Sequence, residues 1–156
     1  MRLKLIWIGE TRNRHLAALE EDYRNRINRF LSCEIIAVNE EKKSDRHSRA
    51  AGMLRESKAL ERKLRMASYR VALDESGDQV SSRELAGLLE NWMVNGVEEV
   101  AFVAGGARGI PAEIGCRINK KWSLSRLTLP HELARVVVLE QIYRALTLVK
   151  GMPYHK

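Results

Sequence analysis

The chain has 156 residues, of which 45% are hydrophobic and 30% are charged. With 10 Gly and 3 Pro, this composition excludes a disordered or collagen-like protein. The length fits one globular domain, which we expect to span residues 1–156. The 27 Lys and Arg exceed the 20 Asp and Glu, and the net charge of +7 favours a polyanionic partner, although solubility alone also accounts for it.

The sequence gives no indication of a membrane span or of secretion. The apolar stretch near the start is too short for a signal peptide, and no run reaches the ~18 to 20 apolar residues that cross a bilayer. Cys33 and Cys116 lie far apart, unlike the dense cysteines of a secreted disulfide scaffold. We therefore expect a cytoplasmic protein.

The N-terminal segments predict a strand, a helix and a second strand. Residues 3–9 are typical of a short buried strand that ends at a glycine, and residues 33–39 are a second strand candidate. Between them, apolar residues at steps of three and four predict one buried helix face. This face consists of Leu16, Leu19, Tyr23, Ile27 and Phe30.

A basic run follows at residues 42–65. A thin apolar stripe predicts a helix from about residue 48, and its members are Ala50, Met53, Leu60 and Leu64. Such a run is typical of a solvated helix with charge pairs, and it also suits a surface that contacts phosphates. The sequence leaves both interpretations open.

The middle of the chain continues the alternation of strand and helix. Residues 69–76 predict a strand closed by Gly77, and residues 98–105 predict another. Ser81 and Glu84 have the spacing of a capping box at the start of the intervening helix. The expected buried face of that helix consists of Leu85, Leu88, Leu89 and Trp92.

The C-terminal third predicts a short helix, a short strand and a long helix. Pro111 suits the first position of a helix that carries Ile114 and Ile118. Residues 123–130 predict the last strand, and residues 131–151 predict a helix stopped by Gly151. The whole order predicts an α/β fold with a mostly parallel sheet flanked by helices.

Ligands of such sheets bind in the loops at the carboxyl ends of the strands. Three loops are therefore of interest, and they follow Leu73, Ala104 and Ser123. Gly105, Gly106 and Gly109 form a glycine-rich loop that suits either a tight turn or the close approach of a ligand. No Lys-Ser or Lys-Thr follows it, which disfavours a phosphate-binding P-loop.

The residue pattern predicts no metal site. The four histidines are dispersed, and neither cysteine has a neighbour at ligand spacing. The histidines are His15, His47, His131 and His155.

The last helix is apolar around almost its whole circumference, so we expect it to be covered both by the core and by a second subunit. Arg135, Glu140, Gln141 and Arg144 need partners if they are buried there. Glu140 and Arg144 stand at i and i+4, which fits an intrahelical ion pair or a role beside a ligand.

Four stretches carry a resemblance to a known family: GGARG at 105–109, WSLSRLTLPH at 122–131, RVVVLEQIYRA at 135–145 and PYHK at 153–156. In these stretches the chain resembles the ribosomal RNA large-subunit methyltransferase H family of the SPOUT superfamily. The resemblance implies a C-terminal trefoil knot, a homodimer, S-adenosylmethionine as methyl donor, and methylation of pseudouridine N3 in bacterial 23S rRNA. General fold rules alone reject a knot.

The resemblance also implies site residues. The donor site corresponds to Leu73, Gly105, Leu124, Ser125, Arg126, Leu127, Thr128 and Leu129. The candidates for orienting or deprotonating the acceptor are His131, Glu140, Arg144, Tyr154 and His155, with no role assigned to any of them.

Plainer roles stay open for these candidates. His131 also suits a helix cap, and Tyr154 also suits packing beneath the C-terminus. Two other functions compete with methyl transfer. One is a non-catalytic α/β module that binds RNA or the ribosome through the basic run, and the other is a nucleotide-binding enzyme of another class.

Overall fold

The computed structural model describes residues 1–39, 46–106 and 109–154, and for residues 46–51 it describes the backbone alone. The strands are β1 (Arg2–Ile8), β2 (Cys33–Val38), β3 (Tyr69–Gln79), β4 (Glu99–Ala104) and β5 (Lys120–Ser123). The helices are α1 (Arg14–Ile27), α2 (Arg46–Leu64), α3 (Ser82–Val94), the short 3₁₀ helix η1 (Ala112–Arg117) and α4 (His131–Val149). The predicted alternation of strands and helices is thus confirmed.

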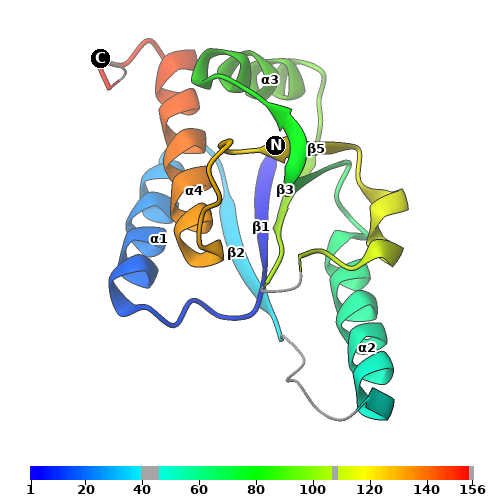
Figure 1. Ribbon diagram of the computed structural model, residues 1–156. Coiled ribbons are helices and arrows are strands. Elements are labelled where there is room, and N and C mark those ends of the chain that lie inside the picture. Colours follow the sequence, from blue (N-terminus) through cyan, green and yellow to red (C-terminus); the bar gives the residue numbers. More distant parts are fainter. Residues whose placement is uncertain (40–45, 107–108, 155–156) are drawn as a thin grey trace.

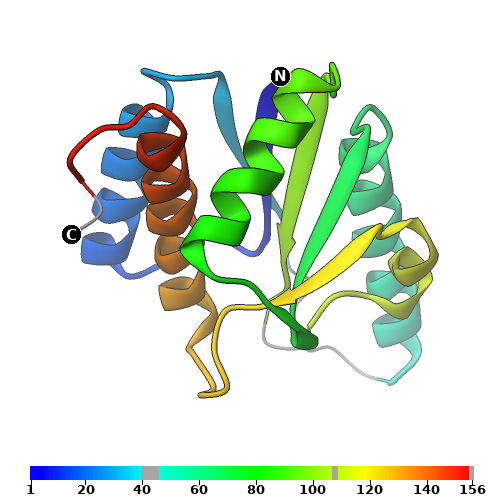
Figure 2. The same cartoon turned by 90° about the horizontal axis from the view of Figure 1, so that it is seen from above.

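The five strands form one parallel sheet in the order β2-β1-β4-β3-β5. Helices α1, α3 and α4 cover one face, and α2 and η1 cover the other (Figures 1 and 2). The central strand β4 needs helices on both faces of the sheet, because all six of its residues are buried. Val100 and Phe102 pack beneath α3 and α4, whereas Ala101 and Val103 face α2 and η1. The predicted α/β class is therefore confirmed.

Helix α4 lies between α1 and α3 (Figure 1), so the chain itself covers much of its apolar circumference. Val138, Leu139, Ile142 and Leu146 are almost fully buried. The helix ends as the sequence predicts: Gly151 has a φ of +63°, and its N–H donates to the carbonyl of Leu148.

Several predicted boundaries are wrong. Strand β3 continues through Gly77 to Gln79, and the last strand is β5 at Lys120–Ser123, so most of the predicted strand 123–130 is a loop. In α1, Leu19 is 43% exposed while Glu20 is buried in its place. Hydrophobic spacing fixes the helix but not its rotation, and buried partners for the Glu20 carboxylate set that rotation.

Other predictions hold. Ser81 and Glu84 form the capping box of α3, and Leu85, Leu89 and Trp92 are buried on its inner face. Among the described residues, no helix is both long enough and apolar enough to cross a membrane. The trefoil knot remains a prediction.

Candidate active site

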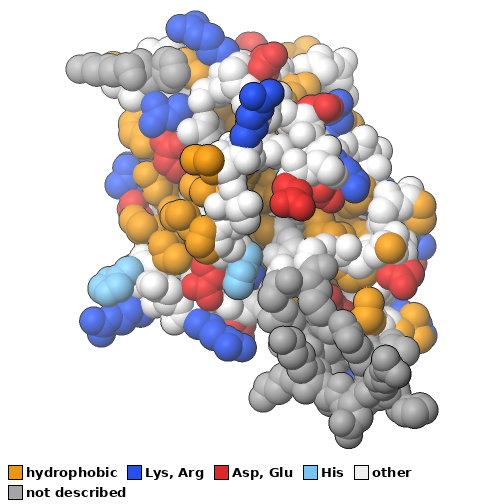
Figure 3. Space-filling view, in the orientation of Figure 1, with side chains coloured by type: hydrophobic (Ala, Val, Ile, Leu, Met, Phe, Trp, Pro, Cys, Tyr) orange, Lys and Arg blue, Asp and Glu red, His pale blue; other side chains and the backbone are white. Residues whose placement is uncertain are grey.

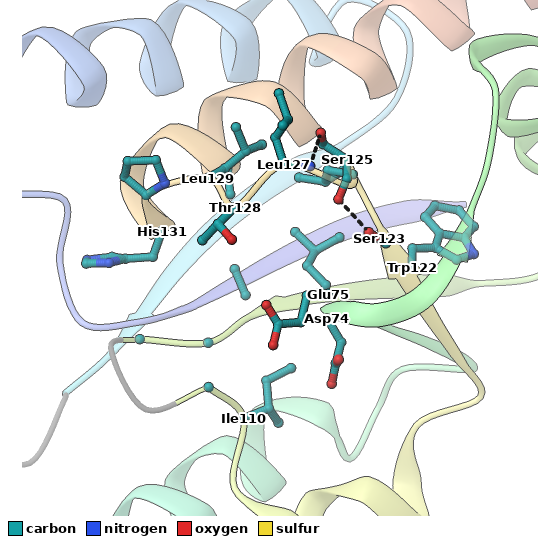
Figure 4. A pocket seen from close by; sticks show the side chains of 18 residues that line it. Asp74, Glu75, Ile110, Trp122, Ser123, Ser125, Leu127, Thr128, Leu129 and His131 are labelled. Carbon is teal, nitrogen blue, oxygen red and sulfur yellow. Dashed lines mark hydrogen bonds between the residues drawn. The ribbon is translucent and has the colours of Figure 1, made fainter.

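A cavity of about 670 Å³ opens at the carboxyl ends of β3 and β4 and beside the end of β5 (Figure 4). Its walls come from the three loops that follow Leu73, Ala104 and Ser123, and from the first turn of α4. The lining residues are Leu73, Asp74, Glu75, Ala104, Gly105, Gly106, Gly109, Ile110, Trp122, Ser123, Leu124, Ser125, Leu127, Thr128, Leu129, Pro130, His131 and Ala134. The three loops chosen from the sequence therefore meet in one place.

The first wall is an irregularity within β3. Both Leu73 and Asp78 align with Trp122 of β5, so the chain between them leaves the strand and returns. Gly77 permits this return, because a Cβ there would lie 2.5 Å from the backbone carbon of Lys121. The irregularity brings Asp74 and Glu75 to the cavity.

Asp74 stabilises this turn through local contacts. Its Oδ1 accepts hydrogen bonds from the backbone N–H of Ser76 at 2.9 Å and from the Ser76 hydroxyl at 2.6 Å. Its Oδ2 accepts from the Lys121 ammonium at 3.1 Å. The hydrogen bonds from Ser76, and then the contact with Lys121, hold the pKa of Asp74 below its ordinary value.

The second wall is the glycine-rich loop after β4. Gly106 and Gly109 form an antiparallel bridge in which the Gly109 N–H donates to the Gly106 carbonyl at 3.0 Å. A Cβ on Gly105 would lie 2.5 Å from the backbone carbon of Gly109. A side chain at Gly105 would thus collide with the backbone of Gly109 and force the turn to shift. Ala107 and Arg108 lie outside the described residues.

The third wall is the loop 124–130. The Ser123 hydroxyl donates to the carbonyl of Ser125 at 2.9 Å, and the Ser125 hydroxyl accepts from the Leu127 N–H at 2.9 Å. These bonds hold a loop where alternating apolar residues predicted a strand. Arg126 is exposed and, unlike its neighbours in the motif, does not line the cavity.

The beginning of α4 closes the cavity and is hydrogen-bonded to the residues just before α1. The residue before the helix is Pro130, which provides no side-chain cap, so His131 does not take the capping role. Glu132 accepts hydrogen bonds from the backbone N–H groups of Arg12 and Asn13 at 2.9 and 3.1 Å. These two bonds hold the pKa of Glu132 below its ordinary value, the bond from Arg12 contributing most.

Other candidates gather away from this cavity. Arg144 donates to the carboxylate of Glu140 at 2.6 and 3.0 Å, and the Tyr154 hydroxyl lies 3.3 Å from the same oxygen. The Arg144 guanidinium lies 4.9 Å from the centre of the Tyr154 ring. Burial, followed by contacts with Tyr23 and Glu140, raises the pKa of Tyr154 to about 12, so its phenol is protonated at neutral pH. His155 lies outside the described residues.

Sequence reasoning did not name Asp74, Glu75, Ile110 and Trp122 as site residues. The two carboxylates follow Leu73 directly, so the end of a buried strand was the available indication. Trp122 opens the motif at 122–131, which was the available indication for it, whereas Ile110 carried no comparable pattern. Within the described parts of the chain, no three His, Cys, Asp or Glu side chains are grouped to hold a metal ion.

The sheet and the cavity define an α/β protein with a candidate ligand site beside its parallel strands. A family model described as "Predicted SPOUT methyltransferase" matches residues 1–155. The chain therefore belongs to the SPOUT methyltransferase family, as its C-terminal motifs predicted.

Two relatives match over essentially their whole length, and both are named ribosomal RNA large subunit methyltransferase H. The protein of Streptococcus equi subsp. equi is 37% identical over 159 residues, covering 100% of both chains. The protein of Gloeobacter violaceus is 39% identical over 155 residues, covering 99% of both.

Solved structures share the fold. A probable methylase family protein from Haemophilus influenzae superimposes with a TM-score of 0.61 at 15% identity, covering 99% of this chain and 70% of the other. A putative methyltransferase from Legionella pneumophila, solved with bound SAM, gives a TM-score of 0.51 at 13% identity, covering 95% of this chain and 66% of the other.

Proposed function

We propose that this protein transfers a methyl group from S-adenosylmethionine to N3 of a pseudouridine in the 23S rRNA of the bacterial large ribosomal subunit. The observation that carries the proposal is the cavity in a SPOUT-family chain, which is lined by two motif-bearing segments, 105–109 and 122–131. The names of the full-length relatives support the rRNA substrate, and the resemblance of the C-terminal motifs supports pseudouridine N3. The reaction would take place in the cytoplasm, with residues 1–156 acting as one domain.

The cavity suits the methyl donor. Its volume of about 670 Å³ lies within the ~300 to 1,000 Å³ that is usual for small-molecule sites. Apolar side chains of Leu73, Ile110, Leu124 and Leu129 offer a slot for an adenine ring, and Gly105 adds backbone to the cavity wall. The donor carries no phosphate, so the site needs no P-loop lysine.

When bound, the donor supplies a methyl carbon to which N3 forms a bond while the carbon–sulfur bond breaks and its electron pair stays on a neutral thioether sulfur. The chain must hold N3 in line with that carbon and accept the proton that N3 loses. His131 lines the cavity and carries a ring nitrogen that can accept a proton, so we assign it as the first candidate for this role.

We further propose that a homodimer formed through α4 completes the site. At 1.5 Å per residue, Glu140 and Arg144 lie about 13 and 20 Å along the helix from His131, too far to reach their own cavity. The exposed Leu133 and the half-buried Val137 and Leu148 share the outer side of α4 with this ion pair. A second copy seated there would cover these apolar groups and bring the Tyr154 end of one chain toward the cavity of the other.

Donor binding and methyl transfer test the main proposal separately. Calorimetry with S-adenosylmethionine should show one site per chain, and purified ribosomes or subunits that lack the modification should accept a labelled methyl group. Folded protein that binds no donor at high micromolar concentration would contradict methyl transfer and favour the non-catalytic RNA-binding module.

Mixing two inactive variants tests the shared site. Gly105→Val removes the donor site of one chain, and deletion of residues 154–156 removes the tail of the other. If each site combines the cavity of one subunit with the tail of its partner, random mixing restores about a quarter of the wild-type sites. A site built within one chain would give no restoration.

A further inference from the structure

The charge of the cavity differs from that of the whole protein. The chain carries 27 Lys and Arg against 20 Asp and Glu. Yet the described residues that line the cavity include two carboxylates, Asp74 and Glu75, and neither a Lys nor an Arg. Figure 3 shows acidic side chains near the middle of this face, with Lys and Arg mostly around its outline. The cavity therefore suits a ligand with a positive charge.

The two carboxylates are not equivalent. Asp74 is engaged by Ser76 and Lys121, and these contacts hold the irregular turn of β3 in place. Glu75 forms no hydrogen bond or ion pair with another of the residues that the structure describes, although it lines the same wall. Figure 4 shows both carboxylates on the side of the cavity where Ile110 lies, across from Thr128. Asp74 thus stabilises the cavity wall, and the Glu75 carboxylate is available to contact a ligand.

We propose that Glu75 is a specificity-determining residue that recognises the positive sulfonium of the methyl donor, so that the site prefers the donor to its uncharged thioether product. This inference rests on the proposed function. The donor and the product share the adenine, the ribose, the ammonium and the carboxylate, and they differ in the methyl group and in the charge on sulfur. A carboxylate at the cavity wall attracts the donor's sulfur and gains nothing comparable from the product's.

The consequence is a site that favours loading and product release. Glu75 is exposed, so water and salt screen its charge, and the preference should be about two- to fivefold rather than many orders of magnitude. Because the positive charge on sulfur disperses as the methyl group leaves, a carboxylate that binds the donor does not accelerate the chemical step. Glu75 should therefore affect KM for the donor and inhibition by the product, and not lower kcat when removed.

The test compares Glu75→Gln with the wild-type protein in calorimetric titrations of S-adenosylmethionine and S-adenosylhomocysteine. The variant should bind the donor about two- to fivefold more weakly and the product with nearly unchanged affinity. Raised salt should reduce the wild-type preference and leave the variant unaffected. At saturating donor, kcat should be preserved.

Asp78→Asn is the matched control. Asp78 belongs to the same strand and pairs with Lys120 at 2.5 Å, but it does not line the cavity. This control should leave both affinities unchanged.

Two outcomes would overturn the inference alone. If Glu75→Gln weakened the binding of donor and product equally, the carboxylate would contact the ammonium group that both share. If the affinities for both stayed unchanged, Glu75 would contact solvent and not the ligand. Wild-type protein that binds neither compound would instead contradict the proposed function itself.

Discussion

The guanidinium of Arg135 donates a hydrogen bond of 2.8 Å to the hydroxyl of Thr11, across 124 positions of the sequence. The same hydroxyl donates to the carboxylate of Glu20 at 2.6 Å, and Arg135 also donates to the carbonyl of Ile8 at 2.8 Å. Glu20 in turn accepts from the indole N–H of Trp7 at 3.2 Å. This buried network connects β1, α1 and α4, and it fixes the turn of α4 that carries His131 to the cavity.

Replacing Thr11 with Val should lower the free energy of unfolding by about 1 to 3 kcal/mol, because Arg135 and Glu20 each lose a buried partner. Thr11→Ser keeps the hydroxyl and should recover most of the loss. Urea titrations measure the free energy of unfolding of both variants. They should be made at one fixed protein concentration, because the stability of a dimer depends on concentration. Equal stability of the Val variant and the wild type would show that the network contributes little.

Glu20 predicts a specific pH dependence. Burial is the largest cause that raises its pKa above the ordinary value of 4.5. The folded state therefore holds this proton more tightly than the unfolded state does. The resulting stability is complete below about pH 4.5 and is lost as the pH rises through the folded-state pKa.

Glu20→Gln removes this titration and loses one acceptor at every pH. The stability of the variant relative to the wild type should therefore be lowest at acid pH. It should increase as the pH rises above 4.5, the ordinary pKa of a Glu carboxyl. Urea unfolding at about pH 4 and about pH 7 measures the change. If the difference in stability between variant and wild type were the same at both pH values, the pKa of Glu20 would not be raised in the folded protein.

Gly105→Ala should weaken donor binding at least about tenfold, equivalent to about 1.4 kcal/mol, because the added Cβ collides with the Gly109 backbone and opens the turn. RNA affinity should be largely retained. Gly87→Ala is the control, since a Cβ there meets nothing within 4 Å in α3. If Gly105→Ala reduced donor binding, RNA binding and thermal stability together, misfolding would explain it better than a local change.

Tyr154→Ala and Tyr154→Phe separate the ring of Tyr154 from its hydroxyl. The ring packs edge-on against Tyr143 with 4.8 Å between centroids and lies under Arg144, whereas the hydroxyl contributes the contact with Glu140. We expect Tyr154→Ala to reduce methyl transfer by about tenfold or more while donor binding survives. Tyr154→Phe should raise the activation free energy of methyl transfer by at most about 1 kcal/mol. A fully active Ala variant would assign the tail no part in the reaction.

Lys42, Lys43, Arg46 and Arg49 begin the basic run, and the placement of their side chains lies outside what the structure describes. Replacing all four with Gln should weaken RNA binding and flatten its dependence on salt. The logarithmic slope should fall by up to about 0.7 to 0.9 for each phosphate that the variant no longer neutralises. Filter-binding titrations across a salt series measure that slope. If the salt dependence of RNA binding were unchanged, the basic run would not contact phosphates and would be interpreted as a solvated helix surface.

The sequence indicated much of the site because its loops coincide with strand ends. Leu73 is the last residue of β3 that pairs with β4, and Gly105 follows the last residue of β4, so the parallel sheet brings both to one place. The error at residues 123–130 has a different cause. Leu127 and Leu129 alternate with polar residues as in a strand, but the Ser123 and Ser125 hydroxyls bond to the loop's own backbone and divert it from the sheet.

Local patterns in the sequence were sufficient to predict the α/β class, the family and the three segments beside the cavity, because periodicity and short motifs are local properties of the chain. The three-dimensional packing was needed to show that Glu20 is buried and Leu19 exposed, and that Asp74 and Glu75 line the cavity. It was also needed to show that Glu140 and Arg144 lie away from the cavity. These outcomes depend on contacts between distant segments, such as the one between Arg135 and Thr11. Such contacts form only when sheet register, helix rotation and buried hydrogen bonds are satisfied together.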